Sequence, residues 1–185
     1  MGLARKTRRK YDTPNHPWQA ERIDEEKKLI DEYGLTNKKQ IWKMSSLLRN
    51  FRKQARDIIG LRGERKESSI KILISKLTRL GLLKKDSTTG DVLNLSLRDI
   101  LERRLQTVVY KMGLANSVKQ ARQFILHRKV IVNEKVISSP SYLINAGDKV
   151  SLKSGFIPNI VKVVVESPKV EVKETEVPNS KEVTA

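Results

Sequence analysis

The sequence predicts an α+β protein, in which a mostly helical N-terminal domain precedes a small module of two helices packed on a short, hairpin-based antiparallel sheet. Two patterns predict it. As far as Ile125, apolar residues recur at steps of three and four, which is helical spacing. From Val130, short runs of β-branched residues alternate with turn residues, as in a hairpin sheet. The 185 residues suffice for one or two compact domains with tails.

The chain is expected to divide into four segments that differ in charge. They are a basic arm at 1–19, a helical domain at 20–95, the module with a flanking strand at 96–165, and a disordered polar tail at 166–185. The formal net charge is +17. Such an excess favours a polyanionic partner, with nucleic acid the first candidate. An anionic membrane is the second, but no apolar run reaches the roughly 18 residues that span a bilayer.

The N-terminal arm is basic and rich in turn residues. Pro14 and Pro17 restrict the backbone, which predicts an irregular, extended segment. Two interpretations remain open: a tail without fixed structure, or an arm that becomes ordered against RNA. The positive charges favour the second; the candidate RNA-binding residues here are Arg5, Lys6, Arg8, Arg9 and Lys10.

Two helices open the helical domain, over 20–33 and 37–59, ended by Gly34 and Gly60. The acidic residues of the first are expected to form a solvated face or to pair with neighbouring Lys and Arg. We expect Trp18 and Trp42 to pack and not to stack on bases. In the second helix a core face is predicted from Ile41, Met44, Leu48, Phe51, Ala55 and Ile58, and an RNA-binding face from Arg49, Arg52, Lys53 and Arg56.

A basic loop at 63–66, a helix at 67–80 and a turn at 86–91 are predicted next. Ser96 and Asp99 resemble a capping box, which predicts one helix from there to Met112. Gly113 ends it.

The module continues with a helix capped by Ser117, whose apolar residues point inward while Lys119, Arg122 and Gln123 point away. Strands are predicted at 130–132 and 136–137 around a two-residue turn, Asn133–Glu134. A turn at 145–148, a strand at 149–153 and a further strand at 160–165 complete the prediction.

Catalysis and metal binding have little support. The chain has no cysteine and only two histidines, far apart in sequence. It has no zinc-protease, nucleophile-elbow or phosphate-loop motif. No enzyme activity and no cofactor are expected.

The order of an Arg-rich helix, Gly113, Ser117-x-x-x-Ala121-Arg122, a hairpin with Val132-Asn133, Pro140-Ser141 and Gly147-Asp148 resembles the RNA-binding module first named for small-subunit ribosomal protein four. That module also occurs in some tyrosyl-tRNA synthetases, pseudouridine synthases and ribosome-associated stress proteins. The flanking stretches are similar to the archaeal and eukaryotic branch of the protein-four family, and they read RKTRRKYDTPNHPW, LIDEYGL, NKKQIWK and LERRLQTVVYKMG. The resemblance covers about residues 1–165.

The resemblance implies a structural, cytoplasmic constituent of the small ribosomal subunit, present in a single copy. It implies a primary binder of 16S-type ribosomal RNA at the five-way junction of the 5′ domain, acting early in assembly. It places the protein near the channel through which messenger RNA enters and beside small-subunit protein five, without a membrane partner. The alternative is a standalone RNA-binding factor associated with ribosomes.

The resemblance also implies RNA-facing positions in the module. Any single basic residue is more often a solvated surface group, and His127 could equally cap its helix. Family members usually have a Gly between that His and the strand, where this chain has Arg128. The matching candidates are Arg103, Arg104, Lys111, Ser117, Lys119, Gln120, Arg122, Gln123, His127, Arg128, Lys129 and Asn133.

Overall fold

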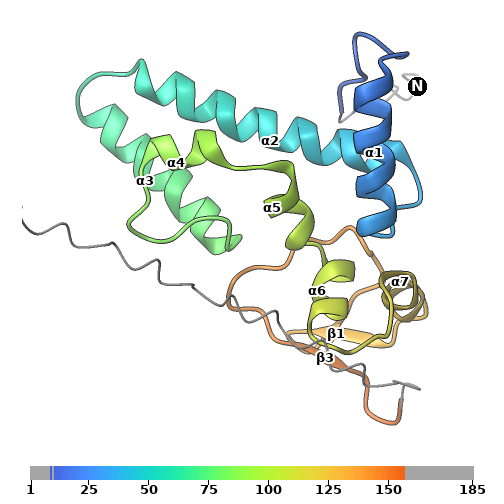
Figure 1. The fold of residues 1–185 in the computed structure, drawn as a ribbon. Helices are drawn as coiled ribbons and strands as arrows, with labels where there is room; N and C mark the ends of the chain where they lie inside the picture. The colour runs from blue at the N-terminus through green and yellow to red at the C-terminus, as the bar shows by residue number, and fades with distance from the viewer. Residues whose placement is uncertain (1–8, 10, 157–185) are drawn as a thin grey trace, which may run out of the picture.

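The computed structural model describes residues 9 and 11–156, and within them seven helices precede and flank a three-stranded antiparallel sheet (Figure 1). The predicted α+β class is confirmed. The predicted strand at 160–165, the tail at 166–185 and residues 1–8 and 10 of the basic arm lie outside the described residues. The helices are α1 (Ala20–Glu32), α2 (Lys38–Ile59), α3 (Glu64–Arg79), α4 (Thr89–Asn94), α5 (Leu97–Glu102), α6 (Leu105–Lys111) and α7 (Val118–Leu126).

The long helix α2 organises the helical part. In Figure 1, α1 stands across one end of α2, while α3, α4 and α5 lie below α2 and pack against it. The predicted core face of α2 is confirmed, except that Met44 is only half-buried. It contributes to two clusters. The larger is built from Leu48, Phe51, Ala55, Ile58, Leu73, Leu77, Val92, Leu95 and Ile100; the smaller, against α1, from Tyr33, Leu35, Ile41 and Leu101.

The module has its own core beneath α6 and α7. Strands β1 (Val130–Val132), β2 (Lys135–Val136) and β3 (Val150–Leu152) form the sheet in the order β2-β1-β3. Its buried cluster comprises Leu105, Val109, Ala115, Ala121, Phe124, Ile125, Val130, Val132, Ile144 and Val150. Helix α5 packs in the two clusters of the helical part, whereas Leu105 packs in the cluster of the module. The boundary between the two cores therefore lies at Arg103–Arg104.

The hairpin turn has the geometry expected of a two-residue connection. Asn133 and Glu134 have φ of 46° and 68°, so both central residues are left-handed, as a type I′ turn requires. Val132 pairs with Lys135 across the turn. Compared with the prediction, β2 starts one residue earlier and β3 is one residue shorter at each end.

Three element predictions are wrong. The expected basic loop at 63–66 is mostly the first turn of α3, where Glu64 and Glu67 favour the positive end of the helix dipole. The expected turn at 86–91 runs into α4, and the Thr88 amide donates to the Asp91 carboxylate at 2.7 Å.

The third error concerns the helix predicted from Ser96 to Met112. Its capping box is confirmed, since the Ser96 amide donates to Asp99 at 2.7 Å and Ser96 Oγ accepts from the Asp99 amide at 3.3 Å. The helix nevertheless divides into α5 and α6, because Arg104 is extended, with ψ of 139°. The break is held by a distant segment: the Leu105 amide donates to Tyr142 O at 2.8 Å, and the Ile144 amide to Arg103 O at 2.9 Å.

Candidate nucleic-acid interface

Helix α7 separates a buried apolar side from a free polar side. Ser117 Oγ accepts from the Gln120 amide at 3.2 Å and fixes the start of the helix. Ala121 and Ile125 are fully buried against the sheet. Lys119 and Gln123 are exposed and Arg122 is half-exposed on the other side. The packing therefore directs these polar groups outward.

The segment after α7 extends the same surface. His127 is the C-terminal cap residue of α7, and its side chain is exposed. Arg128 is exposed and has φ of 56°, the left-handed region that favours glycine. Lys129 is half-buried, with its ammonium 5.3 Å from the centre of the Phe156 ring. We define the α7 surface as Lys119, Arg122, Gln123, His127 and Arg128, which have no side-chain partner among the described residues.

Several other predicted residues already have partners within the protein. Ser117 and Gln120 hold the start of α7, where Gln120 Oε1 accepts from the Asn116 amide at 2.7 Å. Asn133 connects the hairpin to the following turn, donating to Asp148 at 2.7 Å and accepting from the Lys149 amide at 2.9 Å. Lys111 is exposed but pairs with Glu102 at 3.2 Å.

The paired arginines at the start of α6 are structural. Arg103 is half-buried and donates to Ile144 O at 3.1 Å. Arg104 is 1% exposed, and its Nη2 donates to Gln40 Oε1 at 3.0 Å. Burial lowers the pKa of Arg104 to about 10, and the nearby charge of Arg122 adds to the shift. Arg104 thus joins the module to α2 from inside.

Gln106 makes a second polar joint between the two parts. It is fully buried, and its Nε2 donates to Gly34 O after α1 and to Val118 O in α7, both at 3.1 Å. Gly34 has φ of 56°, and a Cβ there would lie 3.2 Å from Gln106 Nε2 and 3.0 Å from Val118 Cγ1. Sequence reasoning missed this residue, since a Gln within a basic helix looks like a surface group.

The predicted cationic face of α2 is only partly free. Arg49 pairs with Asp12 at 2.9 Å, and Arg52 donates to the carbonyl of Leu95. Lys53 and Arg56 are exposed without a partner among the described residues. Helix α2 carries two further exposed cations, Lys39 and Lys43, which the sequence prediction did not include. Charge alone does not show which lysines of a helix remain free to bind RNA. We define the α2 surface as Lys39, Lys43, Lys53 and Arg56.

Of the predicted arm residues, Arg9 is exposed, whereas Arg5, Lys6, Arg8 and Lys10 lie outside the described residues. The segment that follows is fixed to α2. The Asp12 amide donates to Ser46 Oγ at 3.0 Å, and the Tyr11 and Trp42 rings are 6.2 Å apart. Trp42 packs as predicted, but the expectation for Trp18 is wrong: its side chain is 91% exposed.

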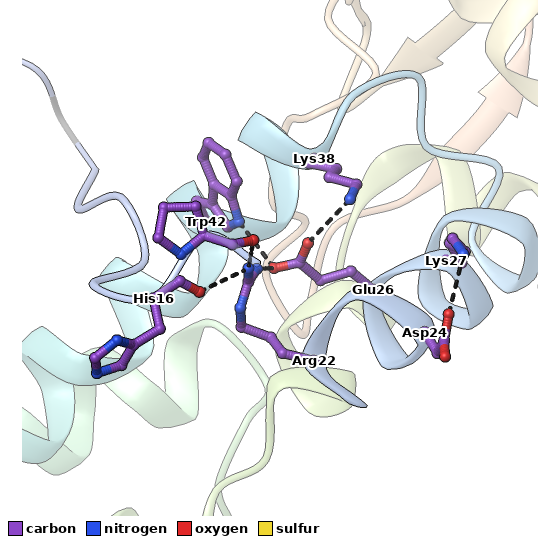
Figure 2. Close-up of polar contacts among 8 residues, drawn as sticks. His16, Arg22, Asp24, Glu26, Lys27, Lys38 and Trp42 are labelled. Atoms are coloured by element: carbon purple, nitrogen blue, oxygen red, sulfur yellow. Dashed lines mark hydrogen bonds and ion pairs between the residues drawn. The ribbon is translucent and has the colours of Figure 1, made fainter. Parts of the chain in front are cut away.

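Among the acids of α1, Glu26 fits the expected pairing with neighbouring cations and not the solvated face. Glu26 is 5% exposed, and its Oε1 accepts from Trp42 Nε1 at 3.0 Å and from the Arg22 guanidinium (Figure 2). Arg22 also donates to Pro17 O at 2.9 Å and His16 O at 3.3 Å. A buried carboxylate therefore holds the turn that precedes α1.

No helix in the described part of the chain is both long and apolar enough to cross a membrane. The described residues also contain no group of three or more His, Asp or Glu side chains suited to a metal ion. The features they do contain are a two-helix, three-stranded module with free cations, attached to a helical domain.

That architecture defines a protein that carries an S4 domain, and the S4 domain profile matches residues 103–150. Relatives match far more of the chain than the module. The small ribosomal subunit protein uS4 of Methanococcus aeolicus is 54% identical over 145 residues, covering 78% of this chain and 82% of the relative.

Two further relatives with the same name are similar over comparable lengths. That of Methanothermobacter thermautotrophicus is 43% identical over 159 residues, 86% of this chain and 92% of the relative. That of Saccharolobus solfataricus is 47% identical over 150 residues, which cover 80% of this chain and 83% of the relative. The chain belongs to the small ribosomal subunit protein uS4 family. The predicted archaeal-type resemblance is confirmed, and so is the expectation of a non-enzymatic family.

Proposed function

We propose that this protein is a structural constituent of the cytoplasmic small ribosomal subunit and binds its 16S-type ribosomal RNA. The observation that carries the proposal is the α7 surface, where free cations stand on the outer side of a helix whose inner side is fixed in a core. Such cations bind phosphates by charge, and Arg adds a planar pair of donors. RNA folded in A-form is recognised largely through backbone shape, which demands positioned cations.

The α2 surface supplies a second contact on the same RNA. Arg104 and Gln106 connect the two parts of the protein through buried hydrogen bonds, so the α7 and α2 surfaces keep a fixed relation. Two weak contacts held in a fixed relation act together as one stronger contact. A junction with several helical arms fits two separated cationic surfaces better than a single straight duplex does.

The finer parts of the proposal come from the family resemblance. They are binding at the five-way junction of the 5′ domain, an early role in subunit assembly, a place near the channel through which messenger RNA enters, and contact with small-subunit protein five. We propose that the chain comprises an arm at 1–19, a helical domain at 20–95, the module at 96–165 and a tail at 166–185. The arm would add its cations to the RNA contact.

The test compares three RNAs across a salt series: a ribosomal five-way junction fragment, a transfer RNA and a plain duplex. The protein is expected to bind the junction most tightly, with affinity falling steeply as salt rises. Replacing Lys119→Glu together with Arg122→Glu is expected to weaken junction binding at least tenfold while the helical circular dichroism stays intact.

The matched control is Lys84→Glu with Lys85→Glu, which makes the same charge change at two exposed lysines outside both surfaces. This control should lose much less affinity than the α7 double variant. Equal binding of all three RNAs, or equal losses in the two double variants, would contradict the proposal.

A further inference from the structure

One part of this basic protein has the opposite charge. Residues 11–33 contain seven acidic and three basic side chains. On the exposed side of α1, Asp24 pairs with Lys27 at 3.0 Å and Glu32 with Arg98 at 3.5 Å. Glu21, Glu25 and Asp31 have no ion pair among the described residues. This face repels phosphate, so it is unsuited to RNA.

An exposed tryptophan lies two residues before the start of α1. Trp18 is 91% exposed, although the turn that carries it is held in place. Figure 2 shows why: the Arg22 guanidinium, fixed by Glu26, donates to the backbone carbonyls just before Trp18. A large aromatic ring presented to solvent from a fixed turn is typical of an interface anchor.

A cavity of about 670 Å³ lies beside this turn, between residues 12–16, α1 and α2. Glu25 and Glu26 contribute to its wall. Arg22 and Arg49 line it as well, and the Glu26 carboxylate is already held by the Arg22 guanidinium, by Trp42 Nε1 and by the Lys38 ammonium. Glu25, which is exposed and has no ion pair among the described residues, is therefore the acid that the cavity offers to an entering cation.

We propose that Trp18, the acidic face of α1 and this cavity form a docking surface for an arginine-containing segment of a basic protein partner. Arginine suits all three features. Its guanidinium can stack on an indole ring and pair with exposed carboxylates, including Glu25 at the cavity wall. RNA and anionic membrane lack this chemistry because both carry negative charge. The surface shares no residue with the α7 and α2 surfaces as defined above, and the proposal does not depend on RNA binding.

The test titrates the RNA-free, full-length protein at low salt with a fluorescent hexa-arginine peptide, and with hexa-glutamate for comparison. Only hexa-arginine is expected to bind. Glu21→Gln with Glu25→Gln should weaken binding about fivefold, since two exposed pairs are lost. Trp18→Ala should weaken it about threefold or more, from loss of the cation–π contact.

The matched control is Glu64→Gln with Glu67→Gln, which also removes two exposed acids from the first turns of a helix, here α3. It should leave peptide affinity nearly unchanged. Equal losses in the two double variants, or no loss in Trp18→Ala, would overturn the proposal.

Other occupants give different outcomes. If this chain's own arm fills the surface, replacing Arg5, Lys6, Arg8, Arg9 and Lys10 by Gln would strengthen peptide binding sharply. If a second copy fills it, sedimentation velocity would show a dimer that Glu21→Gln with Glu25→Gln dissociates. If the face touches RNA, that same variant would change junction affinity. Each of these results overturns the inference and leaves the RNA-binding proposal to its own test.

Discussion

At the scale of single residues, whether a basic side chain is free to bind RNA depends on what the fold places beside it. Arg104 and Arg122 are the same residue type, 18 positions apart in one basic stretch. Arg104 is buried against Gln40, while Arg122 is half-exposed and has no hydrogen-bond or ion-pair partner among the described residues. The helical spacing of the apolar residues in α7 predicted which side of that helix faces outward. It could not predict that Arg103, Arg104 and Asn133 hold the fold, because their partners lie far along the chain.

Arg128 offers a test in which backbone and charge can be separated. Its φ of 56° explains why a glycine suits this position in the family resemblance. Arg128→Gly is expected to raise the free energy of unfolding by about 0.5–1 kcal/mol, because relief of the strain exceeds the added freedom of the unfolded chain. Urea denaturation measures it.

The matched variant is Arg128→Ala, which removes the same charge but keeps a Cβ in the left-handed region. It should give no gain in stability, while both variants lose RNA affinity to the same extent. A stability gain of equal size in Arg128→Ala would contradict the account of backbone strain.

At the scale of elements, local signals predicted both ends of α1 and α2 and the starts of α5 and α7. Ser96 and Asp99 form the expected capping box, and the turn Asn133–Glu134 connects its strands in two residues. The division between α5 and α6 left no local signal, because it depends on backbone hydrogen bonds to residues 142–144. Local propensity favours a continuous helix there, and tertiary pairing outweighs it.

The buried joint at Gln106 belongs to this scale, because it connects the end of α1 to the start of α7. Gln106→Met keeps a similar volume but leaves the carbonyls of Gly34 and Val118 without their donor. It is expected to lower the free energy of unfolding by about 1–3 kcal/mol. Junction RNA affinity, measured where the variant is still folded, should also fall, since the two surfaces lose their fixed relation.

Gln54→Met is the control, because Gln54 is exposed on α2. It should change neither quantity appreciably. If Gln106→Met destabilises the protein but leaves junction affinity unchanged in the folded state, the joint is structural and does not position the two surfaces.

At the scale of the whole molecule, charge and composition indicated a polyanion partner, but geometry decides which cations can act together. The sequence predicted cations on the helix at 37–59 and in the module, and the fold connects these two parts through Arg104 and Gln106. The central claim is that the α7 and α2 surfaces contact one RNA at the same time.

The most direct measurement is the salt dependence of junction binding in four proteins: the unaltered chain, Lys119→Gln with Arg122→Gln, Lys53→Gln with Arg56→Gln, and the combined variant. Each phosphate contact adds about 0.9 to the slope of log affinity against log salt in a duplex and about 0.7 in a single strand. We predict that each pair lowers the slope by roughly two units and that the combined variant lowers it by roughly four. An unchanged slope in the Lys53 and Arg56 pair would contradict simultaneous contact by the two surfaces.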